Sequence, residues 1–123
     1  MQDRFKFRHW DKRINKIFYP ERNDNFGYYV NNSDIIETMQ CTGLKDKNGK
    51  LIYEGDIVKA ITHNPYEKHI GVIQFHTCYF SLDYINLGKY GEAGISLAKN
   101  TGDFVSLEII GNIFQDKKLM NEA

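Results

Sequence analysis

The chain has 123 residues, with 16 lysines and arginines against 16 aspartates and glutamates, so its formal net charge is zero. This length predicts one domain with its own core, and a composition that is 41% hydrophobic and 14% aromatic excludes disordered and low-complexity classes. A zero net charge argues against a protein that lives on phosphate backbones, because such proteins carry a cationic surplus.

Charge is nevertheless uneven along the chain. The first 22 residues hold seven basic groups against three acidic ones, so we expect any contact with an acidic partner at this end. The chain starts Met-Gln-Asp-Arg without an apolar leader, and no apolar run reaches the roughly 20 residues of a membrane helix. We therefore expect a protein of the cytoplasm with no membrane partner, in which Cys41 and Cys78 stay reduced.

Two-residue alternation of polar and apolar side chains dominates the chain and predicts a mainly β fold. Residues 4–10 predict a first strand, with Phe5 and Phe7 on its buried side and basic residues on the other. A second strand is predicted over 16–19. The Asn- and Asp-rich stretch 21–34 predicts a long loop or an irregular hairpin.

From residue 35 onward, short alternating segments bounded by Gly, Asn or Pro predict further strands. They are expected at 35–41, 51–53, 57–62, 69–75, 79–84, 95–98 and 104–110, followed by a turn and a short helical segment within 112–120. The whole chain, 1–123, is predicted to be one domain. Its barrel-like core over 42–113 is predicted to be an SH3-like small barrel portion. An additional N-terminal strand pair and loop over 1–34 and a short C-terminal helical turn complete the prediction.

Residues 42–58 show the clearest turn pattern of polar residues and glycines in the chain. Asp46 is placed to accept backbone N–H groups at the start of a turn, and Asn48 and Gly49 tolerate positive φ. A functional alternative is that Asp46, Glu54 and Asp56 hold a metal or act as acid and base, as in a carboxylate-dependent hydrolase. The spacing of a calcium loop is absent, and carboxylates in turns are usually structural. We therefore expect no metal, no cofactor and no enzymatic activity.

Histidine and cysteine offer a second metal hypothesis. His76 and Cys78 have an i, i+2 spacing that can share one strand face, and His63, His69 and Cys41 are further candidates only by elimination. Because no CxxC or HxxxH pattern is present, ordinary histidines and thiols are the favoured interpretation.

Nucleic acid is the alternative partner, because the sequence contains basic and aromatic residues that could contact it. Arg4, Lys6, Arg8 and Trp10 share one parity on the first predicted strand and would form a cationic stripe. Basic side chains also guard sheet edges against wrong pairing, and the zero net charge favours that interpretation.

Aromatic residues exceed what a small core requires. Eight Tyr, eight Phe and one Trp are present, and tyrosines fall in or near predicted loops and edges. Tyrosine suits an interface because it combines apolar area with a polar tip. We therefore expect a binding module for a protein partner or for a second copy of this chain, as a homo-oligomer. The tyrosines concerned are Tyr28, Tyr29, Tyr66, Tyr79, Tyr84 and Tyr90.

Three segments, 5–11, 40–58 and 107–114, together resemble the YopX family of phage and prophage proteins. The resemblance implies a small β-rich protein that acts inside an infected bacterial cell, and it implies no reaction. It also implies a signature with a structural or binding role and no catalytic residue. The signature residues are Arg8, Trp10, Asp11, Thr42, Gly43, Asp46, Gly49, Tyr53, Glu54, Gly55, Asp56, Gly111 and Asn112.

Overall fold

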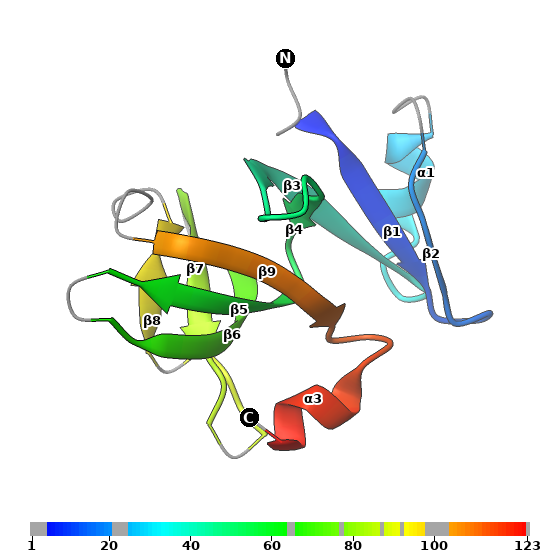
Figure 1. Ribbon diagram of the computed structural model, residues 1–123. Helices are drawn as coiled ribbons and strands as arrows, with labels where there is room; N and C mark the ends of the chain where they lie inside the picture. The colour runs from blue at the N-terminus through cyan, green and yellow to red at the C-terminus, as the bar shows by residue number, and fades with distance from the viewer. Residues whose placement is uncertain are drawn as a thin grey trace.

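The computed structural model describes residues 5–20, 25–63, 66–76, 78–86, 88–91, 93–97 and 104–122. Within these ranges the chain is built from short antiparallel strands with two short helices (Figure 1). In chain order they are β1 (Phe7–Asp11), β2 (Lys16–Phe18), α1 (Phe26–Asn31), β3 (Ile36–Lys45), β4 (Leu51–Tyr53), β5 (Asp56–Thr62), β6 (Lys68–His76), β7 (Tyr79–Tyr84), β8 (Gly94–Ser96), β9 (Phe104–Asn112) and α3 (Lys117–Glu122).

The strands form two antiparallel sheets. Sheet I has the order β2-β1-β3-β4, and sheet II has the order β8-β7-β6-β5-β9. The chain passes from sheet I to sheet II at the corner between β4 and β5, where Gly55 has a φ of 84° that favours glycine. Figure 1 shows the two sheets side by side, with α1 on sheet I and α3 beside sheet II.

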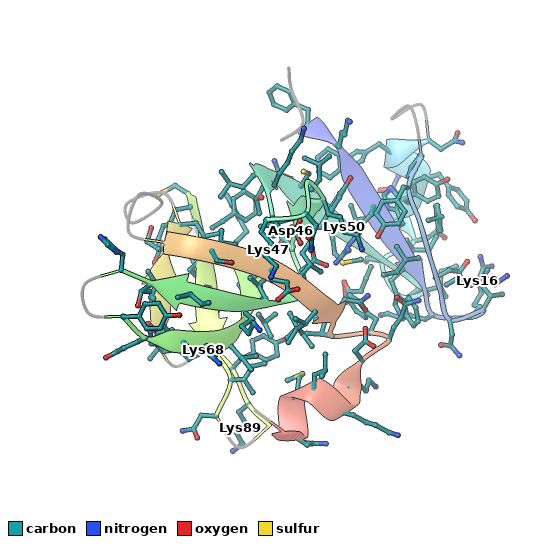
Figure 2. All side chains as sticks on the ribbon, in the orientation of Figure 1. Lys16, Asp46, Lys47, Lys50, Lys68 and Lys89 are labelled. Carbon is teal, nitrogen blue, oxygen red and sulfur yellow. The ribbon has the colours of Figure 1, made fainter. Side chains whose placement is uncertain are left out.

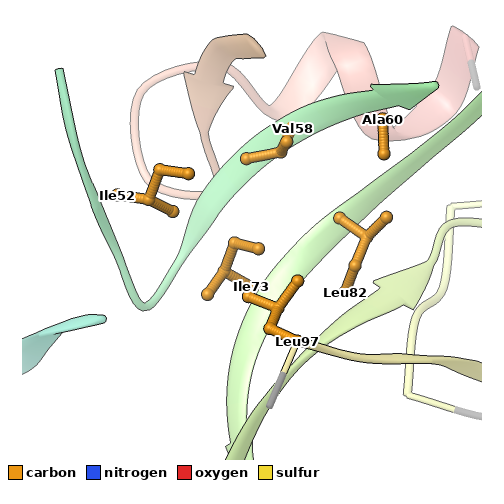
Figure 3. Packing of buried hydrophobic residues seen from close by; sticks show 6 residues of the cluster. All are labelled: Ile52, Val58, Ala60, Ile73, Leu82 and Leu97. Carbon is orange, nitrogen blue, oxygen red and sulfur yellow. The ribbon is translucent and has the colours of Figure 1, made fainter. Parts of the chain in front are cut away.

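The main core lies on one face of sheet II. Figure 3 shows Val58 and Ala60 of β5 together with Ile73 of β6 and Leu82 of β7, all fully buried. Ile52 of β4 enters the same cluster, so sheet I contributes to the core of sheet II. Burial of this apolar surface is the main favourable term that holds the two sheets together.

The other face of sheet II is partly covered by the end of the chain. Ile57 and Val72 are fully buried there, and Leu119 and Met120 of α3 pack against them. The predicted C-terminal helical turn is thus confirmed, and its apolar residues fix it to the sheet.

The stretch 21–34 was predicted as a loop or hairpin, and this prediction is wrong for residues 26–31, which form α1, whereas residues 21–24 lie outside the described residues. The helix buries no residue completely and has no side-chain cap. It is held on sheet I by rings, because Phe26 lies 4.7 Å from Phe7 and Tyr29 lies 4.1 Å from His9 between ring centroids. Sequence period alone does not reveal a six-residue helix stabilised by such contacts.

The mainly β fold and the N-terminal strand pair are confirmed. β1 and β2 do not stand apart, because β1 pairs with β3 from Phe7↔Gln40 to Asp11↔Ile36. The SH3-like detail is not confirmed: sheet II curls, but β8 and β9 are its two edges in the described part of the chain.

Candidate functional site at the junction of the sheets

A buried ion pair joins the two sheets. Arg8 of β1 places Nη2 2.9 Å from Oδ1 of Asp56 at the start of β5, and both side chains are 3% exposed. Asp56 also accepts the backbone N–H of Tyr53 through Oδ2 at 2.8 Å. Both carboxylate oxygens therefore have partners within the protein, as a buried charge requires.

The remaining contacts of Arg8 define the rest of this junction. Nη2 also donates to the carbonyl of Glu54 at 3.0 Å, and Nε contacts the sulfur of Met39 at 3.4 Å. Nη1 donates to the hydroxyl of Tyr19 over a long 3.4 Å. The guanidinium carbon lies 5.0 Å from the centre of the Tyr53 ring, in range of a cation–π interaction.

Burial shifts the acid–base behaviour of this junction. Desolvation raises the pKa of Asp56, and the charge of Arg8 opposes this shift. Desolvation also raises the pKa of Glu54, although its carboxylate accepts the N–H of Gln40 at 2.9 Å. The pKa of Tyr53 is raised to about 12, again mainly by burial, so this phenol remains protonated at neutral pH.

Asp46 organises the predicted turn between β3 and β4 and ties it to sheet II. Its Oδ1 accepts the backbone N–H groups of Asn48 and Lys50, and its Oδ2 accepts that of Ile109 in β9. Desolvation alone would raise the pKa of Asp46, but the hydrogen bonds from Ile109, Lys50 and Asn48 outweigh it and lower the pKa. The predicted role of Asp46 in the turn is confirmed, and the bond to β9 is an additional one.

A pocket of about 520 Å³ opens beside the ion pair. Tyr19, Lys50, Leu51 and Ile109 contribute to its walls. Six residues of the YopX-like signature also line it: Arg8, Gly49, Tyr53, Asp56, Gly111 and Asn112. Pockets of this volume are in the range that holds a small ligand or an anchoring side chain.

The other signature residues have internal structural contacts. Trp10 stacks on Phe114 with ring centroids 5.3 Å apart, which joins β1 to the segment after β9. The carboxylate of Asp11 pairs with Arg13 at 2.9 Å. Thr42 donates to the carbonyl of Ile52 at 2.8 Å, so it closes the β3–β4 hairpin.

Two glycines and one asparagine of the signature shape turns. Gly43 has a φ of 85° and lies where the β3–β4 register shifts. A Cβ at Gly111 would lie 2.8 Å from the carboxyl of Asp116 and from the Leu119 side chain, so both would have to shift to admit it. Oδ1 of Asn112 accepts the backbone N–H groups of Phe114 and Gln115, which starts the turn before α3.

The predicted cationic stripe is not formed as expected. Arg8 and Trp10 are 3% and 8% exposed, because the junction covers the face of β1 that carries them. Lys6 is exposed, and Arg4 lies outside the described residues.

The described residues contain no cluster of ligands that matches either metal hypothesis. Among the described residues, no three His, Cys, Asp or Glu side chains are grouped so as to hold an ion. Cys41 is buried and Cys78 exposed, and the two are not joined by a disulfide. His76 instead places Nε2 2.9 Å from Oδ2 of the buried Asp83, which also accepts the hydroxyl of Ser81. This group of His76, Asp83 and Ser81 on β6 and β7 was not predicted from the sequence. Tyr19 and Lys50 were likewise not predicted as residues of the junction pocket.

The fold and the junction define a small protein of two antiparallel sheets, joined by a buried arginine–aspartate pair with a pocket next to it. The chain belongs to the YopX family, because the family model described as YopX protein matches residues 19–121. It is similar in fold to the crystal structure of protein EF1440 from Enterococcus faecalis, with a TM-score of 0.60, 21% identity, and coverage of 94% of this chain and 96% of that one. No curated protein matches the chain. Among the described residues, no helix has the length and apolar character to span a membrane.

Proposed function

We propose that this protein is a non-enzymatic phage or prophage accessory protein of the bacterial host cytoplasm that works by binding a protein, a second copy of itself included. One observation carries the proposal. Of the eight large hydrophobic side chains that are exposed in the described residues, five belong to the first thirty positions. They are Phe5, Ile14, Tyr19, Tyr28 and Val30.

These side chains lie on or next to β1, β2 and α1, which we call the N-terminal layer. Tyr19 is 57% exposed and Tyr28 54% exposed, although both are large rings. β2 is an edge of sheet I, so its outer backbone groups are also available to a partner in the described structure. Exposed tyrosines beside an open strand edge favour protein recognition, because rings supply apolar area and the edge supplies hydrogen bonds.

The carboxylates of the junction support a binding role over a catalytic one. Asp56 is paired with Arg8, Asp46 accepts three backbone N–H groups, and Glu54 accepts the N–H of Gln40. A general acid or base needs a carboxyl that can reach a substrate proton. Here each carboxylate is engaged in holding the fold.

The nucleic-acid alternative has less support than the protein alternative. Its stripe loses Arg8 to the ion pair and Trp10 to the stack on Phe114. Of the four predicted stripe residues, Lys6 is the described one that stays exposed, and it lies just before β1. A protein partner therefore fits the exposed surface better.

The proposal is tested by measuring association with and without one aromatic side chain of the N-terminal layer. Light scattering gives the mass of the purified protein in solution, and affinity capture from infected cells gives its partners. We expect Tyr28→Ala to reduce the self-association or the capture that the unchanged protein shows. Tyr66→Ala is the matched control, because Tyr66 is 72% exposed but precedes β6 in sheet II. A monomer that captures nothing, or association that depends equally on both tyrosines, would overturn the proposal.

A further inference from the structure

We infer that the pocket beside the Arg8–Asp56 pair is a carboxylate-binding site, which receives an acidic side chain or the C-terminal carboxylate of a protein partner. This inference rests on the proposed function and names the chemistry of the contact. The basis is the hydrogen-bonding capacity that the polar atoms of the pocket walls have not already used.

The acceptor atoms of the charged and amide side chains in the walls are already used. Oδ1 of Asp56 pairs with Arg8, and its Oδ2 accepts the N–H of Tyr53. Oδ1 of Asn112 accepts two backbone N–H groups, and its Nδ2 donates to Gln115 at 2.8 Å. A ligand that mainly donates hydrogen bonds would find few acceptors here.

Donor capacity remains in the same walls. Nη1 of Arg8 lies 3.4 Å from the Tyr19 hydroxyl, beyond the roughly 2.7–3.2 Å of a typical N–H···O bond, whereas Nη2 is held at 2.9 and 3.0 Å. Tyr19 is 57% exposed, so its hydroxyl can turn toward an incoming group. The guanidinium and the phenol can therefore both donate to one acceptor oxygen.

Lys50 adds the charge that selects an anion. Its side chain contributes to the pocket wall, and its charge also acts on Asp46. The charge of Arg8 is balanced by Asp56, and the oxygens of nearby Asp46 are taken by three backbone N–H groups. Figure 2 shows Lys50 near Asp46 in the middle of the molecule, whereas Lys68 of β6 and Lys89, in the connection after β7, lie away from it.

The apolar residues of the walls determine which kind of chemical group can carry the bound carboxylate. Leu51, Ile109 and the ring of Tyr53 line the same space of about 520 Å³. That volume fits one side chain or chain end, and it favours a carboxylate attached to methylene groups or a ring over a small inorganic anion. A glutamate side chain or a C-terminal aromatic residue of a partner has this chemistry.

The test uses two carboxylate probes and their neutral counterparts, followed by amide NMR shifts of the protein. N-acetylglutamate α-amide represents an acidic side chain, and N-acetylphenylalanine represents a C-terminal residue. N-acetylglutamine α-amide and N-acetylphenylalanine amide are the neutral controls. We expect at least one carboxylate probe at millimolar concentration to shift the amide signals of residues 49–51 and Gly111, and its neutral counterpart to shift them several-fold less. The probe that binds identifies the source of the carboxylate.

Charge reversal at the rim completes the test. Lys50→Glu should weaken the carboxylate probe about tenfold, because a favourable charge becomes a repulsive one. Lys68→Glu makes the same change of charge on the far part of sheet II and should leave the binding unchanged. Equal binding of neutral and charged probes, shifts centred elsewhere, or equal effects of the two variants would overturn the inference. Loss of partner binding in Tyr28→Ala with no probe binding here would refute the carboxylate site alone and leave the proposed function standing.

Discussion

Removing Arg8 tests whether the buried ion pair holds the two sheets together. Arg8→Met keeps much of the aliphatic length of the side chain but leaves the Asp56 carboxylate without its cation in a site that is 3% exposed. Breaking a buried pair in this way costs about 3–5 kcal/mol of unfolding free energy, because one charge stays buried and uncompensated. Such a loss is a large fraction of the roughly 5–15 kcal/mol that stabilises a typical domain.

A second arginine provides the control. Arg13 forms an ion pair with Asp11 at the same 2.9 Å, but the Arg13 side chain is 56% exposed. Solvent screens such a pair, so Arg13→Met should change stability much less than Arg8→Met. The two ion pairs have the same N–O distance but differ in burial, so comparing the two variants isolates the effect of burial.

The loss in Arg8→Met should depend on pH. Burial already raises the pKa of Asp56 and Arg8 opposes that shift, so removing Arg8 raises the pKa further. A group whose pKa is higher in the folded state stabilises the fold below its unfolded pKa, and this contribution disappears as the pH rises through the folded value. The deficit of the variant should therefore be largest at neutral pH and shrink on acidification.

Urea unfolding followed by tryptophan fluorescence measures these changes. Trp10, the one tryptophan of the chain, stacks on Phe114 across the junction, so its signal reports on the contact between the sheets. The double variant Arg8→Met, Asp56→Asn should recover part of the loss, because no buried charge remains. Equal losses in the Arg8 and Arg13 variants, or a deficit that does not change between pH 7 and pH 5, would refute this account.

Substitutions at Asp46, His9 and Gly55 test neighbouring features by the same unfolding measurement. Asp46→Ala removes the acceptor of three backbone N–H groups and should cost about 2–4 kcal/mol, whereas Asp46→Asn should cost less; equal losses would contradict this role. Burial lowers the pKa of His9 from 6.5, so stability should fall as the pH drops below that value, and His9→Phe should flatten this slope. Gly55→Ala places a Cβ 3.2 Å from the sulfur of Met39 at a φ of 84° and should cost about 1–2 kcal/mol. Gly27→Ala in α1 meets nothing within 4 Å and should be neutral or stabilising, so a comparable loss there would count against the glycine argument.

The strands and the turn chemistry could be predicted because their signals are local. Alternation places β5, β6 and β7 within one or two residues of their observed bounds, and Asp46 with Gly49 marks the turn between β3 and β4. These features depend on neighbouring residues in the chain. The helix α1 could not be predicted, because contacts of its rings with Phe7 and His9 hold it in place.

The junction shows why the candidate site was only partly predictable. Alternation correctly placed Arg8 and Phe7 on opposite sides of β1, but it cannot tell that both sides are covered. α1 covers one side, and the corner around Gly55 and Asp56 covers the other. Asp56, the partner of Arg8, is far from it in the sequence. Strand alternation alone therefore predicts an exposed cationic stripe where the structure has a buried ion pair.

The outer edge of β9 affects how copies of this protein can add to one another. β9 is a long strand at the rim of sheet II, and the turn between β3 and β4 occupies that rim through Lys47 N–H to the Leu107 carbonyl at 2.8 Å and Ile109 N–H to Asp46 at 3.1 Å. The opposite rim in the described structure, β8, has three residues. Endless growth of a fibre by β-strand addition needs an unobstructed rim at both ends of the repeating unit. In the described part of the chain sheet II has no such pair of rims, so we expect no fibre growth by strand addition at the β9 edge.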